Sequence, residues 1–267
     1  MRIKIYQMDP VLGGKSAITG MVIEPSELNP TAYNLVFDGD IPCDDKTELG
    51  AIFGGRSTDR CTECFHGHDL CTNDLIEVIE DDNSTFFQFE ATEFTDGHLR
   101  PILAPYFSST TFTLDARHRV FGVFAEPGKL AHIRSFDLQT NALHDLFGIG
   151  FDILRLSPNQ DIAVICVGAS VGSTNIAAEP ALNRMLMSLD EYNVPIGPIR
   201  GPLFFCGARF AQHNERVVLH SLHPKVCAKL LAAYQMPERF YEFNTELHSV
   251  PYFPSSCVIN DNEGAFK

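Results

Sequence analysis

The first third of the chain alternates apolar and polar side chains over short stretches, a pattern that predicts strands. Over residues 2–8, isoleucines alternate with polar neighbours, which is the period of a half-buried strand. Residues 33–37 form a second apolar stretch, and the Asp-Gly-Asp sequence at 38–40 predicts a turn after it. Residues 75–79 and 84–89 flank an acidic stretch, so we expect a hairpin with an acidic turn there.

Helical patterns are short. Residues 44–55 begin with capping aspartates and end on two glycines, which predicts a short helix. Residues 140–147 suit a helix that Gly148 ends. The clearest helical spacing lies in residues 226–234, where apolar side chains recur on one face before Pro237 stops the pattern.

The second half of the chain mixes strands and turns in the same way. Residues 119–124 are a predicted strand, and 131–136 begin the next alternation of polar and apolar positions. Residues 152–156 and 161–167 bracket a Ser-Pro-Asn-Gln turn and predict another hairpin, and 202–207 are a short apolar run of the buried-strand type. These patterns predict an α+β fold with two small mixed modules, each a mainly antiparallel sheet with short helices.

The composition is that of an ordinary soluble protein of 267 residues, with 45% hydrophobic and 20% charged side chains. This length provides for about two domains with a sizeable core. No apolar stretch approaches the roughly 18–20 residues of a membrane helix, and residues 1–6 are too short and too polar for a signal peptide. We therefore expect a cytoplasmic protein with no membrane partner. In that compartment the eight cysteines are interpreted as thiols, or in part as metal ligands, rather than as disulfides.

Negative charge is concentrated at the start of the chain. The formal net charge is −14, and residues 1–110 carry 19 acidic and 7 basic side chains, a net charge of −12. This balance argues against direct binding of nucleic acid, because such binding rests on clustered cations. Two explanations stay open. Acidic loops keep the first module soluble, or an anionic surface competes with nucleic acid for a cationic protein groove.

The change in charge also indicates a domain boundary near residue 110. Residues 104–111 combine a proline with small polar residues and are the best linker candidate. We therefore expect an acidic module over residues 1–107 and a second module over residues 108–267. The second module is expected to end in a helix and a loose tail.

Metal-ligating residue types are dense between Cys61 and Cys71. Thiolates and imidazoles suit zinc, and a Cys-x-x-Cys pair can hold one ion from a single turn. Cys61, Cys64, His68 and Cys71 form a set of four in a spacing similar to a zinc knuckle, with shorter later intervals. No second Cys-x-x-Cys occurs in the sequence, which excludes a ribbon-type site. The alternatives are a zinc site or a loop of ordinary thiols, and no other cofactor is expected.

A hydrolase pattern is also present. Gly168, Ser170 and Gly172 match Gly-x-Ser-x-Gly after a predicted strand. In hydrolases a helix follows this turn, whereas here the following residues form a weak helix broken by Pro180. The alternatives are a hydrolase that uses Ser170 with a base such as His213, or a glycine-rich loop.

Three segments of the first module carry a family resemblance: residues 2–8 (RIKIYQM), 33–39 (YNLVFDG) and 67–78 (GHDLCTNDLIEV). In this order they resemble the YodL-like domain family over roughly residues 1–95. That family usually has small polar residues where Cys71 stands and lacks the Cys61–Cys64 pair. The resemblance implies a structural role in the loop that enters the hairpin for Gly67, His68, Leu70 and Asp74.

Four segments of the second module resemble another family: residues 124–129 (FAEPGK), 143–148 (LHDLFG), 182–186 (LNRML) and 201–207 (GPLFFCG). That family has no known function and is common in phages and conjugative elements of Gram-positive bacteria. It carries Asn-Glu-type residues where this chain has Gly168-Ala169-Ser170. Neither family implies a catalytic mechanism. Together they imply an accessory protein of a phage or integrative element, a setting in which small acidic non-enzymes oppose host restriction or CRISPR machinery.

These observations predict a non-enzymatic protein that binds and inhibits a host defence protein, or its nucleoprotein complex, as an anti-CRISPR or anti-restriction factor. Four acidic residues are the candidates for mimicking nucleic acid in a cationic groove: Glu77, Glu80, Asp81 and Asp82. Asn183 and Arg184 are further candidates for a partner contact, the alternative being a helix-capping and salt-bridge role. A zinc-stabilised nucleic-acid-processing accessory module is the alternative function.

Overall fold

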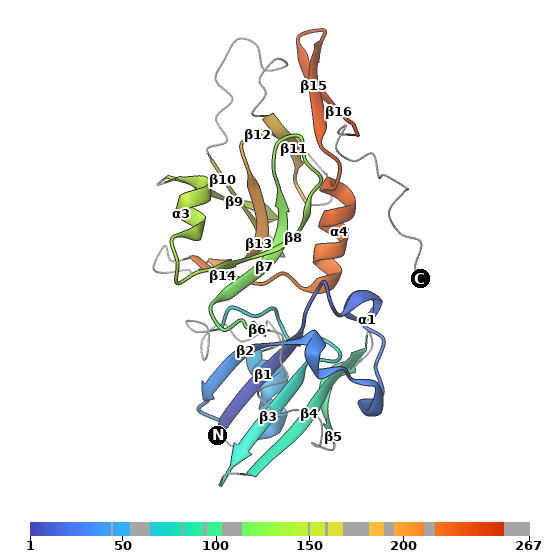
Figure 1. The fold of residues 1–267 in the computed structure, drawn as a ribbon, viewed down its shortest axis with the longest axis vertical. Coiled ribbons are helices and arrows are strands. Elements are labelled where there is room, and N and C mark those ends of the chain that lie inside the picture. Colours follow the sequence, from blue (N-terminus) through green and yellow to red (C-terminus); the bar gives the residue numbers. More distant parts are fainter. Residues whose placement is uncertain are drawn as a thin grey trace, which may run out of the picture. The chain divides into compact units, whose positions relative to one another are not determined.

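The computed structural model (Figure 1) describes residues 1–43, 45–53, 65–81, 83–92, 95–102, 114–148, 150–157, 160–167, 182–189, 195–210 and 217–253. Its fold is α+β, with mainly antiparallel sheets and short helices, which confirms the predicted fold class. Among the described helices, none is both long enough and apolar enough to span a membrane.

The first sheet has six strands: Arg2–Met8 (β1), Tyr33–Asp40 (β2), Leu75–Glu80 (β3), Asn83–Thr92 (β4), Thr95–Ile102 (β5) and Leu114–Asp115 (β6). Their order is β5-β4-β3-β1-β2-β6. Neighbours are antiparallel apart from β2 and β6, which are parallel. The predicted N-terminal strand and the predicted hairpin with an acidic turn are confirmed.

The turn predicted at residues 38–40 is wrong. Strand β2 continues to Asp40, because β1 pairs with it from Met8 opposite Tyr33 to Arg2 opposite Asp40. The hydrogen bonds that a neighbouring strand offers therefore outweigh the local turn preference of aspartate and glycine.

The two faces of β1 belong to separate apolar clusters, because successive side chains of a strand point to opposite sides. Ile3 and Ile5 contribute to one buried cluster, and Tyr6 and Met8 contribute to the other. The N-terminal strand is thus covered on both sides, which explains its central place in the sheet.

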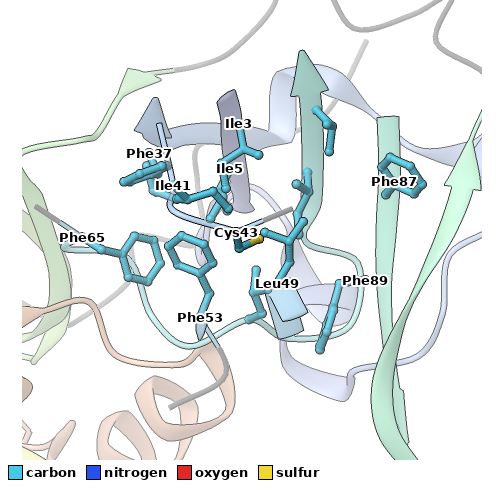
Figure 2. Packing of buried hydrophobic residues seen from close by; sticks show 14 of the residues in the cluster. Ile3, Ile5, Phe37, Ile41, Cys43, Leu49, Phe53, Phe65, Phe87 and Phe89 are labelled. Atoms are coloured by element: carbon cyan, nitrogen blue, oxygen red, sulfur yellow. The ribbon is translucent and has the colours of Figure 1, made fainter. Parts of the chain in front are cut away.

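A group of phenylalanines fills the first of these clusters (Figure 2). Phe37, Phe53 and Phe65 meet edge to face, with ring centroids 5.1–6.3 Å apart. Aromatic rings prefer this arrangement over a face-to-face sandwich. Since Phe65 begins the described segment that leads to β3, the cluster anchors that segment on the sheet.

The second sheet contains Arg119–Ala125 (β7), His132–Asp137 (β8), Asp152–Ser157 (β9), Gln160–Cys166 (β10), Leu203–Phe210 (β13) and Val217–His220 (β14). The order is β8-β7-β13-β10-β9, and β14 pairs with β13. Two separate hairpins are formed by Leu182–Met187 (β11) with Pro195–Arg200 (β12), and by Glu238–Phe243 (β15) with Glu246–Pro251 (β16). The strands predicted in the second half are confirmed by β7, β8, β9, β10 and β13.

The helices are Gly14–Thr19 (α1), Leu49–Phe53 (α2), Ala142–Phe147 (α3) and Pro224–Tyr234 (α4), with 3₁₀ turns at Pro25–Glu27 (η1), Pro30–Ala32 (η2) and Lys46–Glu48 (η3). The last three α-helices confirm the helices predicted from the sequence. Helix α4 buries Cys227, Leu230 and Tyr234, which are three or four residues apart and therefore share one face.

The chain forms two compact units, and neither is one continuous segment. Unit 1 comprises Met1–Gly122, Ile133–Ala142 and Cys206–Lys229, and unit 2 comprises Val123–His132, Leu143–Phe205 and Leu230–Lys267. This division differs from the expected consecutive modules over residues 1–107 and 108–267, since two later segments belong to the first unit. The expected linker and the expected loose tail fall within residues 103–113 and 254–267, outside the described residues.

Candidate functional site

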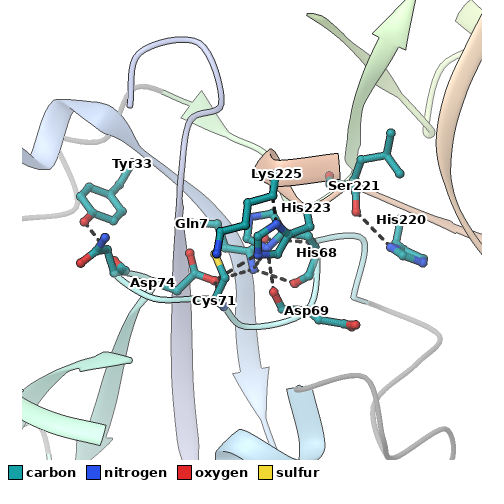
Figure 3. Close-up of polar contacts among 12 residues, drawn as sticks. Gln7, Tyr33, His68, Asp69, Cys71, Asp74, His220, Ser221, His223 and Lys225 are labelled. Carbon is teal, nitrogen blue, oxygen red and sulfur yellow. Dashed lines mark hydrogen bonds and ion pairs between the residues drawn. The ribbon is translucent and has the colours of Figure 1, made fainter. Parts of the chain in front are cut away.

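Residues 65–74 lead into β3 and carry a group of buried polar side chains (Figure 3). This segment lacks regular secondary structure, so its backbone groups need side-chain partners. Gln7 of β1 provides two of them. Its Oε1 accepts from the His68 backbone N–H at 3.0 Å, and its Nε2 donates to the His68 carbonyl at 2.7 Å. Gln7 is itself buried, and it holds the segment to the sheet at His68.

Asp74 is fully buried and closes a turn with Cys71. Its Oδ2 accepts from the Cys71 backbone N–H at 2.9 Å and from Gln7 Nε2 at 3.1 Å. The other carboxylate oxygen, Oδ1, has no hydrogen-bond partner within the described parts of the chain. Burial raises the pKa of Asp74, while His68 and the hydrogen bonds from Cys71 and Gln7 act in the opposite direction.

Like Asp74, His68 has one polar side-chain atom with a hydrogen-bond partner and one without. Its Nδ1 lies 2.8 Å from the backbone oxygen of Asp69 and 3.1 Å from Gln7 Nε2. The two hydrogens of Gln7 Nε2 already have acceptors in the His68 carbonyl and Asp74 Oδ2, and a carbonyl can only accept, so we assign the proton to Nδ1. The lone pair of a neutral ring then lies on Nε2. Nε2 is buried and has no hydrogen-bond partner among the residues that the structure describes.

His68, Cys71 and Asp74 converge on one point. One donor atom from each residue lies within 4.8 Å of the others, and His68 Nδ1 is 3.8 Å from Asp74 Oδ2. Burial raises the pKa of the Cys71 thiol well above its ordinary value, and Asp74 raises it further. Such a thiol is protonated at neutral pH and is a weak nucleophile unless a cation stabilises the thiolate. The arrangement therefore suits metal binding better than covalent catalysis.

His223 borders this group from the residue before α4. The centroid of its ring lies 5.6 Å from that of His68, and its Nδ1 accepts from the Lys225 backbone N–H at 3.1 Å. Burial lowers the pKa of His223 to about 3, and His68 and Lys225 lower it further. The ring is therefore neutral, and it caps the first turn of α4.

Of the four zinc ligands expected from the sequence, the structure brings His68 and Cys71 together. Cys61 and Cys64 lie outside the described residues. Asp74, which was not among the ligands expected from the sequence, joins the group. The available signal was the Cys71-x-x-Asp74 spacing, which lets an aspartate side chain hydrogen-bond to a backbone N–H three residues earlier.

The neighbouring residue Asn73 differs from His68 and Asp74, because both polar atoms of its side chain have hydrogen-bond partners. It has a positive φ of 78°, a conformation that asparagine tolerates better than most residues. Its Nδ2 donates to the Met21 carbonyl at 2.8 Å, and its Oδ1 accepts from Ile23 N at 2.8 Å and from Gln88 Nε2 at 3.0 Å. This side chain ties residues 21–23 to the sheet and has a structural role.

Acidic side chains gather at the end of the first sheet where β1 begins and where β2 and β3 end. This group, called the acidic end below, consists of Asp38, Asp40, Asp45, Glu48, Glu80 and Asp81. Arg2 lies opposite Asp40 on one side and opposite Ile79, the residue before Glu80, on the other. An ion pair of 3.3 Å between Lys46 and Glu80 joins η3 to this end.

The charge of the acidic end is only partly offset. Arg2 pairs with Asp38 at 3.3 Å, and Lys46 pairs with Glu80. All members except Asp38 are exposed to solvent. The end therefore presents an excess of negative charge, and it includes two of the predicted partner-binding residues, Glu80 and Asp81.

Glu77 does not belong to this surface, so its assignment as a partner contact is wrong. Glu77 lies on β3, and the residue is only 7% exposed to solvent. Its carboxylate accepts from the Tyr6 hydroxyl at 2.6 Å and from the Ser84 hydroxyl at 2.5 Å, and Lys4 Nζ lies 3.7 Å away. These partners give Glu77 a structural role within the sheet.

Arg184 in unit 2 is the largest fully buried side chain among the described residues, at 0% exposure. Its Nε donates to the Tyr234 carbonyl at 3.0 Å, and one Nη donates to the backbone and side-chain oxygens of Asn183. The other Nη donates to the carbonyls of Lys129 at 2.8 Å and Gln235 at 3.4 Å. Five N–H donors thus meet five acceptors.

A partner contact by Asn183 and Arg184 is therefore also wrong, because neither side chain is exposed. Asn183 Nδ2 donates to the carbonyls of Ala125 at 3.0 Å and Gly201 at 2.8 Å. The structural alternative fits better. The pair lies on strand β11, and Arg184 donates to the carbonyl of Tyr234, the last residue of α4, so it caps the C-terminal end of that helix.

Three other candidates lie outside the described residues: Asp82, Ser170 and His213. The contribution of Asp82 to the acidic turn and a hydrolase site at Ser170 stay predictions.

A groove of about 510 Å³ opens beside α1 in unit 1. Its lining includes Leu12 and Met21, which are 58% and 70% exposed. No sequence pattern predicts this groove, because its lining comes from short segments with no sustained periodicity. Its exposed apolar side chains offer an alternative contact surface, which binding experiments can compare with the acidic end.

Comparisons of the chain with protein-family models, with curated proteins and with solved structures gave no match.

Proposed function

We propose that this protein is a non-enzymatic accessory protein of a phage or integrative element that inhibits a host nucleic-acid-targeting defence protein in the host cytoplasm. In this proposal the acidic end occupies the cationic groove of the target. The observation that carries the proposal is the gathering of six acidic residues from β2, β3, the turn after β3 and the η3 segment at one end of one sheet. The resemblance of the second half to a family common in phages and conjugative elements supports the setting.

Electrostatics favours this kind of partner. A groove that binds nucleic acid is lined by lysine and arginine side chains that neutralise phosphates. Strands β2 and β3 lie on either side of β1, so the carboxylates at their ends are separated by two strand spacings, about 10 Å. A surface of this sign attracts a protein or a nucleoprotein complex with exposed cations and repels free nucleic acid.

Four of the five described thiols support binding rather than covalent catalysis. Burial raises the pKa of Cys206 and of Cys227 to about 12 and that of Cys166 to about 11, and the pKa of Cys71 is raised as well. Thiols of this kind remain protonated at neutral pH and react slowly.

The direct test measures binding to purified CRISPR effectors and restriction enzymes at increasing salt. Because charge pairs between solvated surfaces are screened, we expect the Kd to rise by about tenfold or more between 50 and 300 mM NaCl. Target DNA should compete with the protein for the effector. Binding that does not respond to salt, or no binding to any member of the panel, would contradict the proposal.

Matched charge variants locate the contact. The triple variant Asp40→Asn, Glu48→Gln, Asp81→Asn removes three exposed charges from the acidic end, and we expect it to bind about tenfold more weakly. The control variant carries Asp145→Asn, Glu242→Gln and Glu246→Gln, which remove the same charge from exposed positions in unit 2. Equal losses in both triple variants would rule out the acidic end as a specific contact. A loss confined to Leu12→Ser, Met21→Ser would place the contact at the groove.

A further inference from the structure

We propose that His68, Cys71 and Asp74 form a metal site in unit 1 that binds one zinc ion or a chemically similar divalent ion. The proposal is independent of the acidic end, since none of the three residues belongs to it. Imidazole, thiolate and carboxylate are the side chains that zinc uses in proteins, and the combination of nitrogen, sulfur and oxygen donors favours it over calcium or magnesium.

Two atoms without partners indicate where the ion binds. Asp74 Oδ1 and His68 Nε2 are buried, and neither has a hydrogen-bond partner among the described residues. A buried polar atom in this state costs free energy comparable to a lost hydrogen bond, so proteins rarely retain it without a ligand or an ordered water. We assign these two atoms, together with Cys71 Sγ, to the ion.

The remaining atoms of these side chains already have the partners expected around a metal site. His68 donates from Nδ1 to the backbone oxygen of Asp69, which leaves the Nε2 lone pair available for coordination. Gln7 and the Cys71 backbone N–H hold Asp74 through its Oδ2. Hydrogen bonds of this kind orient metal ligands and fix the tautomer of a ligating histidine.

The balance of charges at the site also supports a bound cation. Asp74 is fully buried, and a thiolate at Cys71 would add a second negative charge within a few ångströms of it. Lys225 is a nearby cation that acts on Cys71, and its single charge offsets only one of these two. A divalent cation neutralises both charges, and the thiol proton is released to solvent when the ion binds. Bonds of about 2.0–2.3 Å from zinc to its ligands place tetrahedral neighbours about 3.5 Å apart. One donor atom from each residue lies within 4.8 Å of the others, and His68 Nδ1 is 3.8 Å from Asp74 Oδ2, so shifts of these side chains have to bring Nε2 and Oδ1 to bonding distance from the ion.

The test is metal analysis of the full chain, followed by titration of the metal-free chain with Co²⁺. We expect one equivalent of bound zinc per chain and, with Co²⁺, a thiolate-to-cobalt charge-transfer band. Cys71→Ser should abolish the band, whereas Asp74→Asn and His68→Gln should weaken zinc binding by about tenfold or more. Cys227→Ala removes another buried thiol of unit 1 and should leave the band unchanged. Circular dichroism of each variant checks that it is folded.

A double variant, Cys61→Ser with Cys64→Ser, separates this site from the knuckle-like set of four. Full zinc content and an unchanged cobalt band in this variant support the three-residue site. Loss of metal in this variant assigns the ion to the knuckle-like set and overturns the proposal. Substoichiometric zinc together with no cobalt band in the unmodified chain also overturns it, and that outcome does not depend on how any variant folds.

Discussion

Arg184 in unit 2 and the group of His68, Cys71 and Asp74 in unit 1 both bury polar side chains, but they differ in how their hydrogen bonds are satisfied. Each of the five N–H donors of Arg184 meets an oxygen. In the unit 1 group, Asp74 Oδ1 and His68 Nε2 lack partners among the described residues. A buried group with every hydrogen bond formed is explained by the fold. In the unit 1 group, the two atoms without partners belong to side chains that converge with a third ligating residue, and this combination points to a ligand.

The charge on Arg184 is consistent with its structural role. Burial lowers the pKa of its guanidinium to about 10, and Glu238 opposes that shift. The side chain therefore remains a cation at neutral pH. Because its acceptors are mostly backbone carbonyls, Arg184 connects β11 to the C-terminal end of α4, to Gln235 and to the turn at Lys129.

The largest effect should come from removing this cation. Arg184→Met leaves the carbonyls of Tyr234, Lys129 and Gln235 buried without a donor, so we expect the free energy of unfolding to fall by about 3–5 kcal/mol. Urea unfolding followed by circular dichroism measures this change. Zinc content should stay at the level of the unmodified chain, and a variant of undiminished stability would show that the five bonds contribute little.

Zinc should stabilise the chain through unit 1. At free zinc of about 100 times the Kd, binding to the folded state alone adds about 2.7 kcal/mol to the free energy of unfolding. Urea unfolding with zinc and with a chelator measures the difference. Cys71→Ser should remove the response and Cys227→Ala should keep it. A response that survives in Cys71→Ser would mean that the stabilising ion binds elsewhere.

Glu77 and Asp81 should separate stability from partner binding. Glu77→Gln weakens the hydrogen bonds from Tyr6 and Ser84, and we expect a loss of about 1–2 kcal/mol in unfolding free energy with unchanged affinity for the partner. Asp81→Asn, at an exposed turn, should leave stability unchanged and reduce affinity. The reverse pattern, in which Glu77→Gln alone reduces affinity, would place the contact on the sheet and away from its acidic end.

The smallest effect should appear at alkaline pH. The pKa of Cys206 and of Cys227 is about 12 in the folded chain, against an ordinary value of 9.0. The folded state therefore holds these protons more tightly, and the resulting stability is complete below pH 9 and is lost as pH rises towards 12. At pH 10 we expect a loss of about 1 kcal/mol per thiol. Urea unfolding at pH 8 to 10 measures it, and the slope should flatten in Cys206→Ala, Cys227→Ala. An equally steep slope in that variant would assign the pH dependence to other groups.

Local pattern was a good guide to the elements and a poor guide to exposure. The alternation over residues 2–8 and the apolar runs around the acidic turn predicted β1, β3 and β4 correctly, because side-chain period reflects strand geometry. The same pattern could not show that Glu77 lies on a covered face of β3, since polar and acidic residues at strand positions are usually solvated. Arg184 was misjudged for the same reason, as arginine is almost never fully buried unless it is paired.

The candidate metal site shows what the spacing of residues along the sequence can predict and what it cannot. His68 and Cys71 were identified from their spacing, but the spacing carried no information about Gln7, which is 61 residues from His68 and holds it in place. Nor could it show that Asp74 would be buried with one oxygen open. Such facts depend on which strands become neighbours, and that is decided by the pairing of β1 with β3.

The sequence by itself determined the α+β class, most of the strands and the concentration of acidic residues in residues 1–110, because side-chain period and charge are properties of consecutive residues. Only the tertiary structure decided which polar groups are buried, which of them are fully hydrogen-bonded, and that later segments of the chain belong to the first unit. These depend on contacts between residues far apart in sequence, for which no local pattern carries a signal.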